Sequence, residues 1–154
     1  MGIPFVPVKG ILDSDYLKID NGMKVIQDPY SSNEIAVISS IRPDVAIIHG
    51  FKGTHTGYAL IDRMTNSVLA IHASNKVIIS VEEIMTEDNL LPSLHQALVQ
   101  PFYIDFLVQA KEGAHPTKCP GYYDWDKTQI LAYIEASKSQ EAFDAYLEQI
   151  IDRP

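Results

Sequence analysis

The sequence has one cysteine in 154 residues, Cys119. A single thiol cannot form an internal disulfide bond and suits a reducing compartment, so we expect a cytoplasmic protein without a disulfide framework. The same scarcity excludes a metal site built from paired cysteines, and the five histidines have no spacing typical of metal ligands. We therefore expect no bound metal.

Long apolar stretches are also missing. The apolar runs are short, as in Val45–Ile48 and Val68–Ile71, whereas a membrane span needs about 20 apolar residues. Met1–Phe5 has no basic region ahead of an apolar one, so it does not resemble a signal peptide. We expect neither a membrane span nor a secretory signal.

Positive charge is scarce as well. Twelve basic against twenty acidic residues give a formal net charge of −8, and no run of Lys or Arg occurs. Nucleic-acid binders usually carry a basic face that neutralises phosphates, so this function class is excluded. A small anion site remains open, because backbone amides and one or two cations can build one locally.

Short apolar segments alternate with helical patterns, which favours an α/β fold over residues 1–154 as one domain. Val45–Ile48 is apolar at every position, which is typical of a strand in a parallel sheet that helices cover on both faces. The first half of the chain, however, has few predicted helices, so a parallel sheet there would lack cover on one face. Met1–Gly10, with Pro4 and Pro7, can extend but cannot occupy a sheet centre. The predicted strands are Met23–Gln27, Ile35–Ser39, Asp44–Gly50, Tyr58–Ile61, Val77–Val81 and Tyr103–Val108. The predicted helices are Asp62–Ser74, a helix from Asp124-Trp125-Asp126 to about Ala136, and a second tail helix after Ser137.

The segment Asp44–Gly57 combines a buried strand with a loop rich in glycine, histidine and lysine. In open α/β sheets ligands bind beyond the carboxyl ends of the strands, where such loops gather. Glycines allow close backbone approach, and Lys52 could supply charge to a phosphate. The glycine spacing does not fit a dinucleotide fingerprint. The alternative is that these glycines only turn the chain between two strands.

Two further segments are candidates. Glu82-Glu83 directly follows the predicted strand Val77–Val81, where a carboxylate could act as base or nucleophile; alternatively one Glu begins a following helix. In Gly113–Pro116, the glycine and the proline around His115 fix its backbone and hold its ring in one place, as a ligand-facing residue requires. The alternative is a loop histidine that is hydrogen-bonded to a carbonyl. A Cys119–His115 nucleophilic pair is disfavoured by Pro116 and Pro120, which stiffen the connection.

Ordered blocks of the sequence resemble one family. The chain is similar to the alpha subunit of family I coenzyme A (CoA) transferases, the glutaconate type above all, over nearly its whole length. The blocks that carry the resemblance are Gly2–Gly10 with Ser14-Asp15, Arg42–His49, Val77–Ile84, and Gly113–Thr117 with Gly121–Asp124.

The resemblance implies a CoA-transferase-like α/β fold with a largely parallel sheet, flanking helices and a C-terminal helical tail. The family's alpha subunit is about twice as long, and these blocks belong to its second half. Its nucleophilic Glu belongs to the beta subunit in a Glu-Asn-Gly context, which this sequence lacks. Glu82 and Glu83 are therefore not assigned as the nucleophile, and no catalytic residue is assigned.

We thus expect an alpha-type component that moves CoA between an acyl-CoA and a carboxylic acid by a ping-pong mechanism. Its expected partner is a beta-type subunit with the nucleophilic Glu, in an oligomer. A separate chain that carries the first half is a further partner that the resemblance leaves open. A CoA-thioester ring-opening hydrolase of the same fold and a non-catalytic binding protein remain alternatives. The residues expected to bind substrate or CoA are Gly50, Phe51, Lys52, Gly53, His55, Gly57, Glu82, Gly113, His115 and Pro116.

Overall fold

The computed structural model describes residues 3–19 and 22–151. They form two compact units, Met1–Pro43 and Asp44–Pro154. No sequence pattern indicated a boundary at Pro43, and a single domain over residues 1–154 stays a prediction. Within the described residues, no helix is both long and apolar enough to cross a bilayer.

The first unit is a three-stranded antiparallel sheet with the order β1-β3-β2. Its strands are β1 (Phe5–Val8), β2 (Met23–Gln27) and β3 (Glu34–Ser39), and a short 3-10 helix, η1 (Asp15–Lys18), precedes β2. Pro7 lies in β1 at the edge of this sheet, which agrees with its inability to donate a backbone hydrogen bond.

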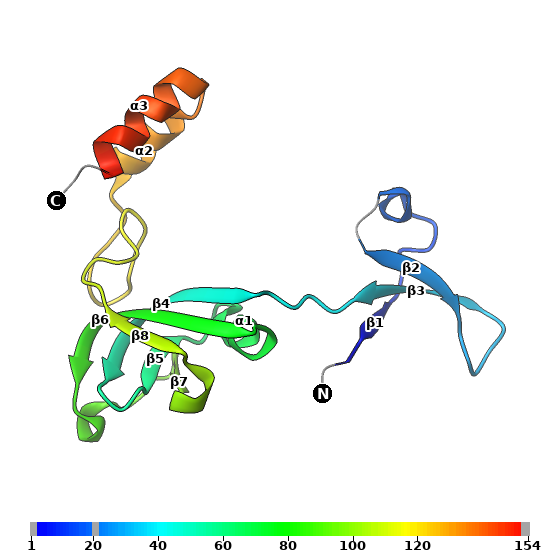
Figure 1. The fold of residues 1–154 in the computed structure, drawn as a ribbon. Helices are drawn as coiled ribbons and strands as arrows, with labels where there is room; N and C mark the ends of the chain where they lie inside the picture. The colour runs from blue at the N-terminus through cyan, green and yellow to red at the C-terminus, as the bar shows by residue number, and fades with distance from the viewer. Residues whose placement is uncertain (1–2, 20–21, 152–154) are drawn as a thin grey trace. The chain divides into compact units, whose positions relative to one another are not determined.

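The second unit contains a five-stranded sheet with the order β7-β5-β4-β6-β8. Strand β6 pairs in parallel with β4 and with β8, whereas β5 is antiparallel to both β4 and β7. Four of the five strands therefore run in one direction, as expected for a largely parallel α/β sheet (Figure 1). The strands are β4 (Val45–Thr54), β5 (Ala59–Asp62), β6 (Lys76–Met85), β7 (Gln96–Val99) and β8 (Phe106–Gln109).

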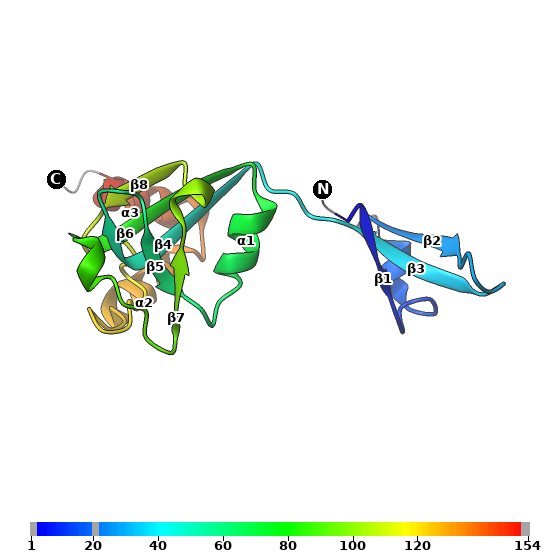
Figure 2. The ribbon, with the colours of Figure 1, turned by 90° about the horizontal axis from the view of Figure 1, so that it is seen from below.

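One face of this sheet carries the main core. Ala46 and Ile48 of β4 and Val77 and Ile79 of β6 are buried with Ile71 of α1 (Ser67–Ala73). Helix α1 lies against the sheet beside β4 (Figure 2). The alternate residues of the same strands point to the opposite face, where the candidate site lies.

Two helices end the described chain. Helix α2 (Lys127–Ala136) begins after Asp126, whose Oδ1 accepts the Gln129 N–H, a standard N-cap contact. Helix α3 (Gln140–Ile151) follows, so the predicted helical tail is confirmed. Two short 3-10 turns, η2 (Glu87–Asn89) and η3 (Pro101–Tyr103), lie in the connections.

Several predicted boundaries were wrong. The predicted strand Tyr103–Val108 begins only at Phe106, because Tyr103 ends the 3-10 helix η3. Strand β4 continues through Gly50 and Gly53 to Thr54, so the predicted Gly50–Gly57 loop shrinks to a turn after the strand. Strand β6 runs to Met85, which places Glu82 and Glu83 inside a strand, neither at its end nor in a helix. Helix α1 begins after Asn66, and the Asp62 carboxylate accepts the Met64 N–H in the turn before it.

Candidate functional site

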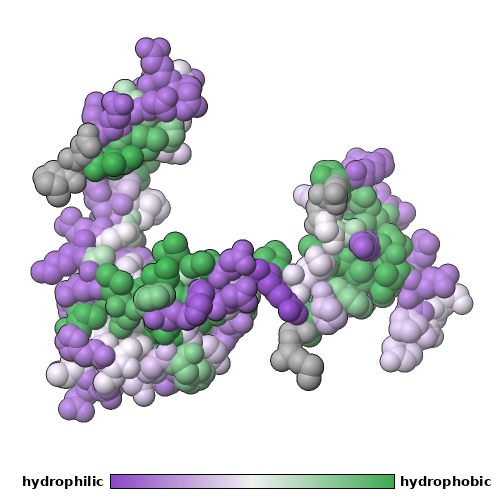
Figure 3. Space-filling model, viewed as in Figure 1, coloured by the Kyte–Doolittle hydropathy of each residue, from purple (hydrophilic) through white to green (hydrophobic). Residues whose placement is uncertain are grey.

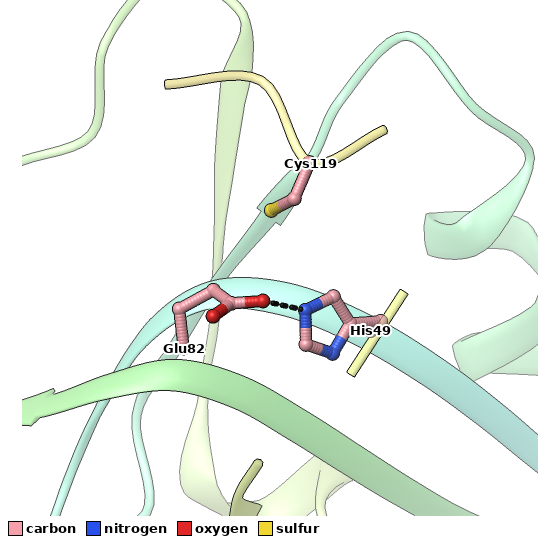
Figure 4. Close-up of side chains that lie close together, drawn as sticks. All are labelled: His49, Glu82 and Cys119. Carbon is pink, nitrogen blue, oxygen red and sulfur yellow. Dashed lines mark hydrogen bonds and ion pairs between the residues drawn. The ribbon is translucent and has the colours of Figure 1, made fainter. Parts of the chain in front are cut away.

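Glu82 is the centre of a buried polar cluster on the second face of the sheet. The residue is 4% exposed. Its Oε1 accepts hydrogen bonds from the Tyr123 hydroxyl at 2.8 Å and from Nε2 of His49 at 2.7 Å. Its Oε2 accepts the backbone N–H of Glu112 at 2.8 Å. Figure 4 shows the Glu82–His49 contact with the Cys119 side chain pointing toward it.

The register of two parallel strands brings this cluster together. His49 of β4 pairs with Ser80 of β6, and Glu82 lies two residues further along β6, on the same face. The His49 ring therefore lies between the two, with Nδ1 2.8 Å from Ser80 Oγ and Nε2 at Glu82. An ionised carboxylate only accepts hydrogen bonds, so Nε2 donates to Glu82.

The segment from Glu112 to Tyr123 depends on this cluster. Glu112 has a φ of 56°, a left-handed conformation that costs a non-glycine residue about 1–2 kcal/mol; the hydrogen bond from its N–H to Glu82 helps to offset that cost. A Cβ on Gly113 would lie 2.8 Å from the His49 ring. The Ala114 N–H donates to the Tyr123 hydroxyl at 2.9 Å. Glu82 and His49 thus fix the backbone of the predicted Gly113–Pro116 segment.

At Glu82, hydrogen bonds lower the pKa of the carboxyl group by more than burial raises it. Burial opposes ionisation, but the Glu112 N–H, the Tyr123 hydroxyl and His49 together hold the pKa of Glu82 below its ordinary value of 4.5. Burial and the Glu82 carboxylate raise the pKa of Tyr123 to about 12, so its hydroxyl stays a donor at neutral pH. The same two causes raise the pKa of Cys119 to about 11. The Cys119 thiol is therefore protonated and a poor nucleophile.

A pocket of about 390 Å³ opens beside the cluster. Its walls combine carboxylates, a lysine and two tyrosines, so it offers both hydrogen-bond acceptors and one cation to a polar ligand. Tyr122 also donates to the backbone carbonyl of Phe51 at 3.3 Å, which ties the loop to β4. The lining residues are Glu82, Glu83, Lys111, Glu112, Tyr122 and Tyr123.

His49, Glu82 and Cys119 bring three potential metal-ligand atoms within 4.8 Å of one another. Both nitrogens of His49 and both oxygens of Glu82 already make hydrogen bonds, and the thiol holds its proton. A cation would have to displace these donors. The arrangement therefore favours a hydrogen-bonded network over a metal centre.

The structure brings only part of the predicted binding set to this pocket. Glu82 lines it, and Gly113 lies against the His49 ring. His55 instead lines a separate pocket of about 380 Å³ with Thr54 and Thr86. His115 and Pro116 line a third, of about 540 Å³, with residues of α2 and α3.

The remaining predicted residues lie within β4 or in the turn that follows it. Gly50 and Gly53 lie within the strand, where a Cβ would meet the Leu60 carbonyl oxygen at 2.7 Å and the Leu107 side chain at 2.9 Å. Phe51 is buried in a second apolar cluster. Lys52 lies 3.9 Å from Glu83 across the strand pair, and Gly57 turns the chain with a φ of 93°.

The ring of His115 contacts Asp126, the residue that caps α2. Its Nε2 lies 3.1 Å from Oδ2 of Asp126, whose other oxygen caps α2. The backbone N–H of Gln129 and then His115 hold the pKa of Asp126 below its usual value. In place of a Cys119–His115 pair the structure has two separate contacts, His115 with Asp126 and Cys119 with the Glu82 cluster.

Sequence reasoning missed Ser80 and Tyr123, and left His49 out of the binding set. Ser80 follows from the strand period, because it shares a face with Glu82 two residues away. Tyr123 lies 41 residues from Glu82, and no local pattern links the two.

Stability in acid should depend on Glu82. Because the pKa of Glu82 is lowered on folding, its contribution is present above its unfolded value near 4.5 and is lost as the pH falls through the folded value. Urea unfolding followed from about pH 6 to about pH 3 measures this loss. We expect the Glu82→Gln variant to lose stability less steeply than the wild type over this range. Equal slopes would contradict the ionised Glu82.

No family model matches this chain, but curated relatives match nearly all of it. It is 30% identical to an uncharacterized protein of Archaeoglobus fulgidus, over 98% of this chain and 34% of that protein. It is 27% identical to the A subunit of 3-oxoadipate CoA-transferase from Pseudomonas knackmussii, over 97% of this chain and 53% of the relative. It is 29% identical to the A subunit of glutaconate CoA-transferase from Acidaminococcus fermentans, over 97% and 52%.

Solved structures match in the same way. Glutaconate CoA-transferase of Acidaminococcus fermentans superposes with a TM-score of 0.83 at 25% identity, over 96% of this chain and 52% of that one. A variant of the decarboxylase AibA/AibB gives 0.75 at 28%, over 98% and 55%. By sequence, the chain is also 23% identical to the cholesterol ring-cleaving hydrolase IpdA subunit of Rhodococcus jostii, over 94% of this chain and 52% of that protein. The chain spans about half the length of the CoA-transferase relatives it matches.

Proposed function

We propose that this chain, a homologue of the A subunits of glutaconate and 3-oxoadipate CoA-transferases over 97% of its length, is an alpha-type component of a CoA-transferase. The observation that carries the proposal is the agreement of sequence and fold on one relative: the Acidaminococcus fermentans enzyme matches at 29% identity in sequence and with a TM-score of 0.83 in structure. The substrate is an acyl-CoA, with CoA passing to a second carboxylic acid.

The reacting carboxylate belongs to a partner subunit in this proposal. A glutamate of the partner attacks the acyl-CoA carbonyl, the C–S bond breaks, and CoA leaves as a thiolate beside a mixed anhydride. The thiolate then attacks the glutamyl carbonyl, which forms an enzyme thioester and releases the first acid as a carboxylate. A second carboxylate takes the CoA by the reverse steps, and the partner glutamate is regenerated.

The geometry of Glu82 supports a reacting carboxylate that belongs to the partner subunit and not to this chain. Three donors hold its two oxygens, and the residue is almost fully buried. Hydrogen bonds that stabilise an ionised carboxylate also lower its reactivity toward a carbonyl. Glu82 therefore suits a positioning role. It accepts the N–H of Glu112 and holds the Tyr123 hydroxyl that accepts the N–H of Ala114. Glu112 and Ala114 flank Gly113, a member of the proposed binding set.

The test is CoA transfer by a reconstituted complex. The chain is co-expressed with a beta-type CoA-transferase subunit and with the part of an alpha-type subunit that it does not match, and acetyl-CoA is offered with a panel of dicarboxylic acids. New acyl-CoA, detected by mass spectrometry, is expected only when all the components are present. Transfer by the chain alone, or neither transfer nor CoA binding by the complete complex, would overturn the proposal.

A CoA-thioester hydrolase is the second candidate, supported by the likeness to the ring-cleaving hydrolase subunit over 94% of the chain. The same assay separates the two. A hydrolase releases free CoA without any acceptor acid, whereas a transferase makes a new thioester only when the acceptor is present. CoA binding without turnover in either assay would instead support a non-catalytic binding protein.

A further inference from the structure

The second face of the five-stranded sheet carries an open apolar surface at the end opposite to the Glu82 pocket. We call it the open strand face. Ile47, Ile78 and Phe106 lie side by side in register on β4, β6 and β8. Ile47 is 77% exposed and Phe106 is 59% exposed. The open strand face consists of Val45, Ile47, Ile78, Phe106 and Val108.

This exposure is unusual for parallel strands. Strands of this kind are normally covered on both faces, because their side chains are apolar on both. Here Ile48 and Ile79 point toward the core with α1, while their neighbours Ile47 and Ile78 point to the other face, where Ile47 is largely exposed. Figure 3 shows hydrophobic atoms gathered over the upper side of this unit, above β4. Contiguous apolar patches of this sort mark interaction surfaces.

The open strand face is continuous with the candidate site. Along β4, His49 follows Ile47 on the same face, and along β6, Ser80 follows Ile78. Val108 of β8 pairs with Ser80, next to His49. A polypeptide seated on the open strand face would therefore border His49 and Ser80 of the cluster.

The curated relatives indicate which polypeptide covers the open strand face. The chain spans 52% of the A subunit of glutaconate CoA-transferase, so about half of that subunit has no counterpart in these 154 residues. Helices of the same subunit normally cover both faces of a parallel sheet. A second copy is a poorer occupant, because two chains of net charge −8 repel each other.

We infer that the open strand face binds the polypeptide that supplies the rest of an alpha-type subunit, through apolar contacts at Ile47 and Phe106. The inference rests on the proposed function and names the surface through which this chain contacts that polypeptide.

The test measures binding without any substrate. The chain is co-expressed with the part of the Acidaminococcus fermentans A subunit that it does not match, so that the two can fold together. The purified complex is then diluted in steps and followed by size-exclusion chromatography with light scattering. A 1:1 complex is expected. Ile47→Glu and, separately, Phe106→Glu should weaken it at least about tenfold, because each buries an unpaired charge. Leu69→Glu, at a residue of α1 that is 68% exposed, is the matched control and should change the affinity less than about twofold.

Circular dichroism verifies that each variant is folded. Three results would overturn the inference: no complex, a complex that Ile47→Glu and Phe106→Glu leave intact, or a homodimer of the chain that these variants dissociate. A complex that forms as described but transfers no CoA would instead contradict the proposed function and leave the docking surface standing.

Discussion

Replacing Glu82 with alanine is expected to lower the free energy of unfolding of the second unit by about 3–5 kcal/mol, the usual cost of removing one partner from a buried charged cluster. The change leaves His49 Nε2, the Tyr123 hydroxyl and the Glu112 N–H without their acceptor. It also removes the hydrogen bond that helps to hold Glu112 at its positive φ. Urea unfolding followed by the fluorescence of Trp125, the only tryptophan, reports on this unit.

Glu83→Ala is the matched control. Glu83 is the next residue of the same strand, its side chain is 49% exposed, and its contact with Lys52 is 3.9 Å long. An exposed pair of this kind contributes about 1 kcal/mol or less. If the two alanine variants lost the same stability, Glu82 would not be the centre of a buried network.

The second large effect is expected at Gly50. Its replacement by alanine should cost about 1–3 kcal/mol, because overpacking of a dense interior forces neighbours to move. The new Cβ would lie 2.7 Å from the Leu60 carbonyl oxygen and 3.1 Å from Cγ2 of Ile61. Thermal unfolding measures the loss.

Gly53→Ala provides the comparison for Gly50→Ala. The Cβ at Gly53 would meet the end of the Leu107 side chain at 2.9 Å, and a flexible side chain gives way more easily than backbone does. We therefore expect a smaller loss of stability at Gly53. A Gly50→Ala variant as stable as the wild type would contradict the packing role of Gly50 and favour a role in close approach to a ligand.

Local signals in the sequence were sufficient to predict the bounds or the cap of several elements. Met23–Gln27 forms β2 with the predicted bounds, and Asp126 caps α2 as its position suggested. These elements depend on neighbours within a few residues, through strand-forming composition in β2 and a side-chain cap in α2. The expected lack of cover on one sheet face is also present, at Ile47.

The predicted strand ends that were wrong depend on contacts between residues far apart in the sequence. Gly50 and Gly53 look like loop residues, but β4 needs them small because Leu60 and Leu107 lie against them. Glu82 looks like a strand end, but it stays inside β6 because donors 30, 33 and 41 residues away satisfy its carboxylate. Burial of a charge is allowed once it is paired, and the pairing is not visible in a local window.

The central claim is that this chain builds a pocket wall while the reacting carboxylate comes from a partner. Intact-protein mass spectrometry of the complete complex, incubated with acetyl-CoA and no acceptor acid, tests it most directly. We expect CoA to be bound as a thioester to the partner subunit and to be released by hydroxylamine. A CoA adduct on this chain, at Glu82 or Glu83 above all, would contradict it.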